Sequence, residues 1–374
     1  MGPPRFGTDG ASAVRLAILS NGPGEVWGWA RPVLSAARAR GWNASIFLLP
    51  CPFASGREEA ALQSLGVSVT RYGSALHAWF AFGENAGFDA VLQLGGDLMF
   101  GRRLAQANRA VLACYTYGMK KGLGHCDLVL APREGLLSVS SAQIVGDLVL
   151  DSLKAGDGLW KRPSGARLIL VPGSRPSIRS QALGLLKETC EKLRQVRPDL
   201  EVRTPLSPFA SDNEWDNWHR AGLYPVEGTI ASVAGGADFA ITQPGTNTLE
   251  LMYLRVPFLT VLPFSFLAKI PVAGLLGILA PQFLRSFYVK RAAVARKGKM
   301  AWPNRMTGRE IVPELVGDLS SDDLSDALSS LLSDRDRLTS LRQKLEGLAQ
   351  AVKPGAPDRI CDLLEEKVTA RHDR

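Results

Sequence analysis

The stretch LAILSNGPGEVWGWARPVL, from Leu16 to Leu34, decides the fold of this chain. Its apolar run is followed by a glycine-rich turn and then by a helical pattern, which is the order of a nucleotide-binding βα unit. Apolar runs and helical patterns keep alternating for about 150 residues, which predicts a parallel sheet covered by helices on both faces. We expect its strands at Val14–Leu19, Ala44–Leu49, Val67–Arg71, Ala90–Leu94, Ala110–Cys114 and Leu128–Ala131.

A second series of the same kind follows the break KAGDGLWKRPSGA over 154–166, where glycine, proline and charge gather as in a linker. Its strands are expected at Leu168–Val171, Glu201–Thr204, Phe239–Thr242 and Phe258–Leu262. The sequence therefore predicts an α/β fold with two Rossmann-like domains facing a cleft, toward which both sets of strands aim their carboxyl ends. We expect a disordered lead-in over 1–13, an acceptor-side domain over 14–155, a second domain over 166–350, and a C-terminal helix over 351–374 able to pack back on the first domain.

Composition excludes several classes of protein. Five scattered cysteines form no CxxC pair and four histidines show no ligand spacing, so we expect reduced thiols in a cytoplasmic protein and neither a metal site nor a cofactor. No acidic residue stands between Glu250 and Glu310, whereas ten basic residues do. The rest of the chain carries 34 basic residues against 36 acidic ones. A local cationic segment of this kind argues against a nucleic-acid coat.

This cationic segment adjoins an unusually apolar one. The longest uncharged run within the stretch 256–287, Ile270–Leu284, has 15 residues and contains two prolines, whereas a spanning helix needs about 20 apolar residues. Apolar residues beside clustered Lys and Arg suit a monotopic contact with an anionic leaflet, and the alternative is a buried helix with a solvated basic neighbour. We expect the segment 262–300 to dock on a membrane through Leu275, Leu276, Phe283, Arg285, Lys290 and Arg291.

The glycine-rich turn after the first strand does not match a dinucleotide-binding loop. Its glycines have the spacing G-x-G-x-x-x-G, and Glu25 would repel a pyrophosphate at the helix N-terminus. Glu25 can cap the helix, accept hydrogen bonds from sugar hydroxyls or act as a base. We therefore expect an acceptor-side loop formed by Asn21, Gly22 and Gly24, with phosphate bound elsewhere.

A second loop of this type lies in LQLGGDLMFGRRLA, over 92–105. Asp97 follows a glycine pair at the carboxyl end of a predicted central strand. Transfer of a group to a hydroxyl needs a base to take its proton, and Asp97 is our first candidate. The alternative is that Asp97 only caps the following helix.

Two loops of the second domain combine glycine, hydroxyl and charged residues at strand ends, PGSR over 172–175 and PGTNTLE over 244–250. Backbone N–H groups, a guanidinium and a helix N-terminus suit a diphosphate, and a glutamate one turn later can accept hydrogen bonds from ribose hydroxyls. The alternative for the second loop is a plain capping box. We expect the donor to be bound by Gly173, Ser174, Arg175, Gly245, Thr246, Asn247 and Glu250.

At these motifs the sequence resembles the lipid-A-disaccharide synthase family, which has the two-Rossmann GT-B fold. The resemblance covers roughly residues 15–364. Its most specific segment, PNRMTGREIVPEL over 303–315, is similar to the family's P-N-x-x-x-G-R-E-x-V-x-E-L and adds Asn304 to the expected donor-binding residues. PGSR matches the family's motif, PGTNTLE is similar to its S-G-T-A-T-L-E, and Asp97 stands where the family has an aspartate considered essential for catalysis.

The acceptor side departs from this pattern. The family opens with G-E-x-S-G-D, whereas here Asn21, Pro23 and Glu25 stand at its Glu, Ser and Asp. Asn247 also replaces a small residue. These changes touch the acceptor side more than the donor side.

The resemblance implies an inverting hexosyltransferase of lipid A biosynthesis that joins a UDP-linked acylated glucosamine to a lipid monosaccharide 1-phosphate and releases UDP. It implies Asp97 as the base, with Glu25 as the other candidate, while Arg175 and the amides of 245–247 hold the departing UDP. It also implies a peripheral position on the inner face of the cytoplasmic membrane, with no nucleic-acid partner. Three other functions stay open: a membrane-associated GT-B glycosyltransferase with another UDP-sugar and glycolipid acceptor, a UDP-sugar 2-epimerase, and a non-catalytic membrane-associated scaffold.

Overall fold

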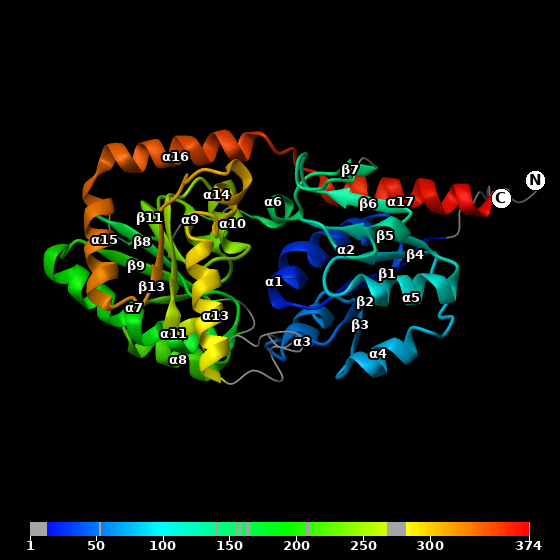
Figure 1. Cartoon of the computed structure of the whole chain (residues 1–374), viewed down its shortest axis with the longest axis horizontal. Helices are drawn as coiled ribbons and strands as arrows, with labels where there is room; N and C mark the ends of the chain where they lie inside the picture. The colour runs from blue at the N-terminus through cyan, green and yellow to red at the C-terminus, as the bar shows by residue number, and fades with distance from the viewer. Residues whose placement is uncertain are drawn as a thin grey trace, which may run out of the picture.

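The structure is a computed structural model that describes residues 13–51, 54–139, 141–154, 156, 159–161, 165–206, 210–267 and 282–373. Each half of the chain forms one parallel sheet with helices packed on it, and the two halves make two lobes side by side (Figure 1). The expected two-domain α/β fold is therefore confirmed. Most of the expected lead-in, residues 1–12, lies outside the described residues.

The first sheet has seven strands in the order β3-β2-β1-β4-β5-β6-β7. Its strands are β1 (Arg15–Ser20), β2 (Asn43–Leu48), β3 (Ser68–Arg71), β4 (Ala90–Gln93), β5 (Val111–Tyr115), β6 (Leu128–Ala131) and β7 (Ala142–Ile144). The helices of this half are α1 (Pro23–Glu25), a π-helical turn (Val26–Ala30), α2 (Arg31–Ala39), α3 (Glu58–Gln63), α4 (Ala75–Ala81), α5 (Leu98–Asn108), a 3₁₀ turn (Leu123–His125) and α6 (Leu148–Ser152).

The second sheet has six strands in the order β10-β9-β8-β11-β12-β13. Its strands are β8 (Arg167–Val171), β9 (Glu201–Leu206), β10 (Pro225–Glu227), β11 (Phe239–Thr242), β12 (Phe258–Pro263) and β13 (Glu314–Gly317). Its helices begin with α7 (Pro176–Val196), α8 (Asp212–Arg220), α9 (Ile230–Ala234), α10 (Asn247–Tyr253) and α11 (Phe264–Leu267). They continue with α13 (Gln282–Ala295), α14 (Trp302–Thr307), α15 (Ser321–Ser333) and α16 (Arg335–Gln350).

Both sheets bury apolar side chains on both faces, as the continuous apolar runs predict. In β1, Leu16 and Ile18 enter one core while Ala17 and Leu19 enter the core on the opposite face. In β8, Leu168 and Leu170 are likewise separated from Ile169 and Val171. Each domain is thus a three-layer sandwich of helices, sheet and helices.

The C-terminal helix α17 (Ala356–His372) leaves the second domain and packs on the first. Ile360, Cys361 and Leu364 are fully buried in the core that also contains Leu16. Figure 1 shows α16 lying along one lobe and α17 continuing along the other. The chain therefore crosses between the domains twice.

A buried carboxylate at the first crossing ties the domains together. Asp147, only 2% exposed, accepts hydrogen bonds from the hydroxyls of Tyr117 in the first domain and Tyr253 in the second. It also accepts one from the backbone N–H of Val149 at 2.9 Å. Burial raises the pKa of Asp147, and these three hydrogen bonds oppose that rise.

Candidate active site between the two domains

The strand orders place the motif loops where an α/β protein binds ligand. In the first sheet the order reverses between β1 and β4, and in the second between β8 and β11. Ligands of doubly wound sheets bind at this switch point, beyond the carboxyl ends of the strands. The loops that follow these four strands are the four glycine-containing loops of the sequence.

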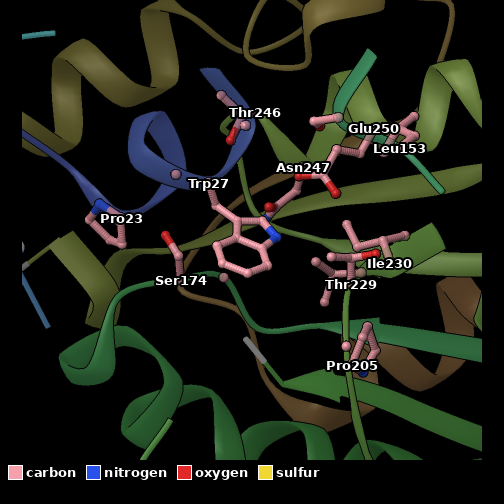
Figure 2. Close-up of a pocket in the computed structure, with 16 residues that line it drawn as sticks. Pro23, Trp27, Leu153, Ser174, Pro205, Thr229, Ile230, Thr246, Asn247 and Glu250 are labelled. Atoms are coloured by element: carbon pink, nitrogen blue, oxygen red, sulfur yellow. The ribbon is translucent and has the colours of Figure 1, made fainter. Parts of the chain in front are cut away.

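The two domains meet at these loops. A Cβ added to Gly24 of the first domain would lie 3.3 Å from the hydroxyl of Thr246 in the second. A pocket between the domains is lined from the first by Pro23, Gly24, Trp27, Gly28, Ser152 and Leu153. From the second it is lined by Val171, Gly173, Ser174, Pro205, Gly228, Thr229, Ile230, Thr246, Asn247 and Glu250 (Figure 2).

On the acceptor side, the loops after β1 and β4 lock together. The backbone N–H of Gly22 donates to the side chains of Asn21 (2.9 Å) and Glu25 (3.3 Å). A Cβ at Gly95 would lie 1.9 Å from a Glu25 oxygen and 2.6 Å from Asn21 Oδ1, so any side chain there would force Glu25 and Asn21 to move. Gly95 therefore lets the second loop approach the carboxylate of the first.

Charges of both domains act on this carboxylate. Burial raises the pKa of Glu25, whereas the Gly22 N–H and the charges of Lys120 and Arg175 oppose the rise. In turn, burial lowers the pKa of Arg175, and the nearby Cys51 and Glu25 counteract that effect. The structure thus brings one expected acceptor-side residue and one expected donor-side residue into the same electrostatic environment.

Asp97 lies in a different hollow. It is the N-cap of α5, where its side chain accepts a hydrogen bond from the N–H of Met99 at 2.9 Å. Its side chain is exposed and lines a groove with Met99, Arg102, Lys121 and His125, outside the pocket between the domains. Asp97 therefore caps α5, and its expected role as a base would have to be exercised from this groove.

On the donor side, side chains of the second domain fix the PGSR loop through hydrogen bonds to its backbone carbonyls. Gly173 has φ +89°, a conformation that favours glycine, and the Gln243 side-chain amide after β11 donates to the carbonyl of Pro172 at 3.0 Å. The fully buried Arg179 donates to the carbonyl of Ser174 at 2.5 Å and pairs with Glu214 at 2.9 Å. The sequence did not single out Arg179, which fixes the loop without lining the pocket.

The PGTNTLE loop presents Thr246, Asn247 and Glu250 to the pocket. Burial raises the pKa of Glu250 to about 7, and the charge of Arg31 on the first domain partly offsets the rise. Burial also lowers the pKa of Arg31, against the pull of Glu250. The guanidinium of Arg31 in the first domain therefore faces Glu250 in the second, the carboxylate expected to accept hydrogen bonds from ribose hydroxyls.

Asn304 has a different role from the one expected. Its side chain is fully buried, donates to Val312 O (2.9 Å) and Glu314 Oε1 (2.8 Å), and accepts from the N–H groups of Ile311 (2.7 Å) and Val312 (2.9 Å). An asparagine side chain has two donor hydrogens and two acceptor lone pairs, so no capacity remains for a ligand. Its assignment to the donor site was wrong, and the residue instead fastens α14 to the 311–314 segment.

The sequence missed several residues that line the pocket. Trp27 reaches the pocket from the π-helical turn, and Thr229 and Ile230 line it from the second domain. The tryptophans and glycines of the turn after the first strand were the only features of the sequence that could have pointed to Trp27. Thr229 and Ile230 belong to no recognised motif, so only the fold reveals them.

The expected membrane segment is described in part. Leu275 and Leu276 lie outside the described residues, and Phe283 and Arg285 fall within α13. Farther along this helix, Arg291 is exposed, and Lys290 lies 5.0 Å from the ring centroid of Phe264 and 3.8 Å from the Asp318 carboxylate. Within the described ranges, every helix falls short of the length and apolar character needed to cross a bilayer.

Comparison with solved structures identifies the fold as GT-B. MurG of Acinetobacter baumannii superposes with a TM-score of 0.56 at 15% identity, over 94% of this chain and 99% of that one. A putative UDP-N-acetylglucosamine 2-epimerase of Listeria monocytogenes gives a TM-score of 0.60 at 14% identity, over 94% and 95%. At these identities the likeness shows the fold alone, and the fold is shared by the two kinds of protein.

Comparison of sequences narrows the likeness to lipid-A-disaccharide synthases. The protein of that name from Anaeromyxobacter sp. (strain K) is 29% identical over 216 residues, 53% of this chain and 49% of the relative. That of Pectobacterium atrosepticum is 26% identical over 230 residues, 59% and 54%. The chain thus spans about half the length of the curated relatives it matches. No family model matches it.

Proposed function

We propose that this chain is an inverting glycosyltransferase that transfers an acylated glucosamine from UDP to a lipid monosaccharide 1-phosphate. The observation that carries the proposal is the convergence of Ser174, Thr246 and Glu250 on one pocket at the switch point of the second sheet, closed by the first domain. The similarity to lipid-A-disaccharide synthases supports the choice of sugar and acceptor.

In this reaction the acceptor hydroxyl attacks the anomeric carbon from the face opposite UDP. The bond from that carbon to the diphosphate oxygen breaks, a bond to the acceptor oxygen forms, and the hydroxyl proton passes to a carboxylate. UDP leaves with its charge met by Arg175 and the backbone N–H groups at the start of α10.

Asp97 is the proposed base, and Glu25 is the second candidate. The groove beside Asp97 combines Arg102 and Lys121 with the apolar side chain of Met99, which suits a phosphate attached to an acylated sugar. Glu25 lies nearer the donor side, and its raised pKa makes its carboxylate a stronger base than an ordinary glutamate.

We also propose that the enzyme works at an anionic membrane surface. Leu76 and Phe80, one helical turn apart on α4, are 71% and 69% exposed, and Met119 is 59% exposed. Trp79 of the same helix lines the Asp97 groove together with Arg102, Arg103 and Lys121, and exposed apolar side chains beside cations suit peripheral docking.

Product analysis tests the proposal. Purified protein incubated with UDP-2,3-diacylglucosamine and its monosaccharide 1-phosphate should give a disaccharide 1-phosphate and UDP in equal amounts. Asp97→Asn and Glu25→Gln, run in parallel, identify the base by which variant loses turnover. A mixture in which UDP-2,3-diacylglucosamine stays intact contradicts the proposal.

The departures at Asn21, Pro23 and Glu25 favour one second candidate, a related transferase with another UDP-sugar and glycolipid acceptor. A panel of UDP-sugars and lipid acceptors distinguishes it, because only the preferred pair should be converted.

Co-sedimentation with phosphatidylglycerol vesicles tests the membrane proposal. The double variant Leu76→Ser, Phe80→Ser should lower the fraction of protein that sediments with the vesicles.

A further inference from the structure

The tryptophan that reaches the pocket is displayed by an unusual turn. Val26–Ala30 is π-helical, a geometry that is rare and frequent at functional sites. Trp29 of this turn stacks on Tyr117 of the first domain, with ring centroids 5.3 Å apart and planes 17° from parallel. Trp27, two residues earlier, instead lines the pocket between the domains. One turn therefore anchors a tryptophan in its own domain and presents another to the opposite domain.

The indole of Trp27 lies among residues of the second domain. Figure 2 shows it extending into the middle of the pocket, between Ser174 and the pair formed by Thr229 and Ile230. Ser174 belongs to the loop proposed to hold the diphosphate. Thr229 and Ile230 lie on the other side of the indole, where the nucleoside end of the donor has to extend.

A cation holds the ring in place. The guanidinium of Arg31 lies 4.7 Å from the centroid of the Trp27 ring, at a distance typical of a cation–π contact. Arg31 is itself fixed by donating to the carbonyls of Trp27 (3.3 Å) and Ser152 (2.6 Å), and its charge acts on Glu250. The ring is thus positioned before any ligand arrives, which lowers the entropic cost of binding against it.

We propose that Trp27 is the nucleobase-binding residue contributed by the first domain, and that its indole stacks on the uracil of the donor. This inference rests on the proposed function in that it takes the donor to be a uridine nucleotide. A flat π-surface beside Ile230 and Pro205 suits a base, while Glu250 is available for the ribose hydroxyls.

The test uses UDP, inorganic pyrophosphate and two matched pairs of variants. Trp79 is the control because Arg103 lies 5.1 Å from its ring in the same way, and it stands in the Asp97 groove rather than in the pocket between the domains. UDP affinity is measured by calorimetry for Trp27→Ala and Trp79→Ala. UDP-induced quenching of tryptophan fluorescence is measured for Trp27→Phe and Trp79→Phe.

Trp27→Ala should bind UDP about tenfold more weakly, in line with the loss of one base–aromatic stack, and should bind pyrophosphate as the wild type does. UDP should quench the fluorescence of the wild type and of Trp79→Phe but not that of Trp27→Phe. Equal or tighter UDP binding by Trp27→Ala overturns the inference, because Trp27 would then be idle or would occupy the nucleotide's space. If the wild type itself fails to bind UDP, the proposed function fails first.

Discussion

Replacing Glu250 by Gln should change how the stability of the protein depends on pH. Burial raises the pKa of this carboxyl to about 7 from 4.5, so the folded protein holds a proton that the unfolded chain has released between those values. Ionisation therefore opposes folding, and the wild type loses stability as pH rises from 4.5 through 7. The difference of about 2.5 pKa units corresponds to at most about 3 kcal/mol, and relaxation around the charge leaves about 1–3 kcal/mol.

Glutamine keeps the size of the side chain and cannot ionise. Glu250→Gln should therefore match the wild type near pH 4.5 and gain about 1–3 kcal/mol of unfolding free energy over it near pH 8, measured by urea denaturation at both values. Glu346→Gln, at an exposed surface carboxylate paired with Arg255, is the matched control and should show no such divergence. Wild-type and Glu250→Gln stabilities that stay parallel across this range would refute the reasoning.

Three further predictions concern the loops and their supports. Asp97→Asn should lower turnover by about 10²–10⁴-fold while leaving UDP affinity unchanged, since the residue lies outside the pocket between the domains; full activity in the variant would remove Asp97 from the reaction. Gly95→Ala should abolish activity without unfolding the protein, because the added Cβ would lie 1.9 Å from Glu25 and displace it. Activity is measured by product formation, and an active variant would show that the contact between Gly95 and Glu25 is dispensable. Asn304→Ala should cost about 2–4 kcal/mol of unfolding free energy by leaving buried partners unsatisfied. The folded variant should bind UDP as the wild type does, measured by calorimetry. A selective loss of UDP binding would instead place Asn304 in the donor site.

The sequence was informative where physics acts locally. Continuous apolar runs marked ten strands, because parallel strands are covered on both faces. It missed β7, β10 and β13, which have three or four residues each and lie at the edges of the sheets, where fewer side chains are buried. Expected and observed ends of the other strands differ by at most two residues, and β6 and β11 match at both ends.

The candidate site was less predictable because it depends on how two domains meet. That Glu25 shares an environment with Arg175, and that Arg31 faces Glu250, follows from the relative placement of segments far apart in the chain. Asn304 shows the opposite error, since a motif residue can be retained for the fold as well as for a ligand. Counting the hydrogen bonds that the side chain already makes distinguishes these two roles, and that count requires coordinates.

A crystal structure of the protein with UDP tests the central claim most directly. The account predicts the diphosphate against Gly173–Ser174 and Thr246–Asn247, the ribose hydroxyls at Glu250, and the uracil between Trp27 and Thr229–Ile230. UDP bound away from the pocket between the domains, or with its uracil ring directed toward Asp97, would contradict this account.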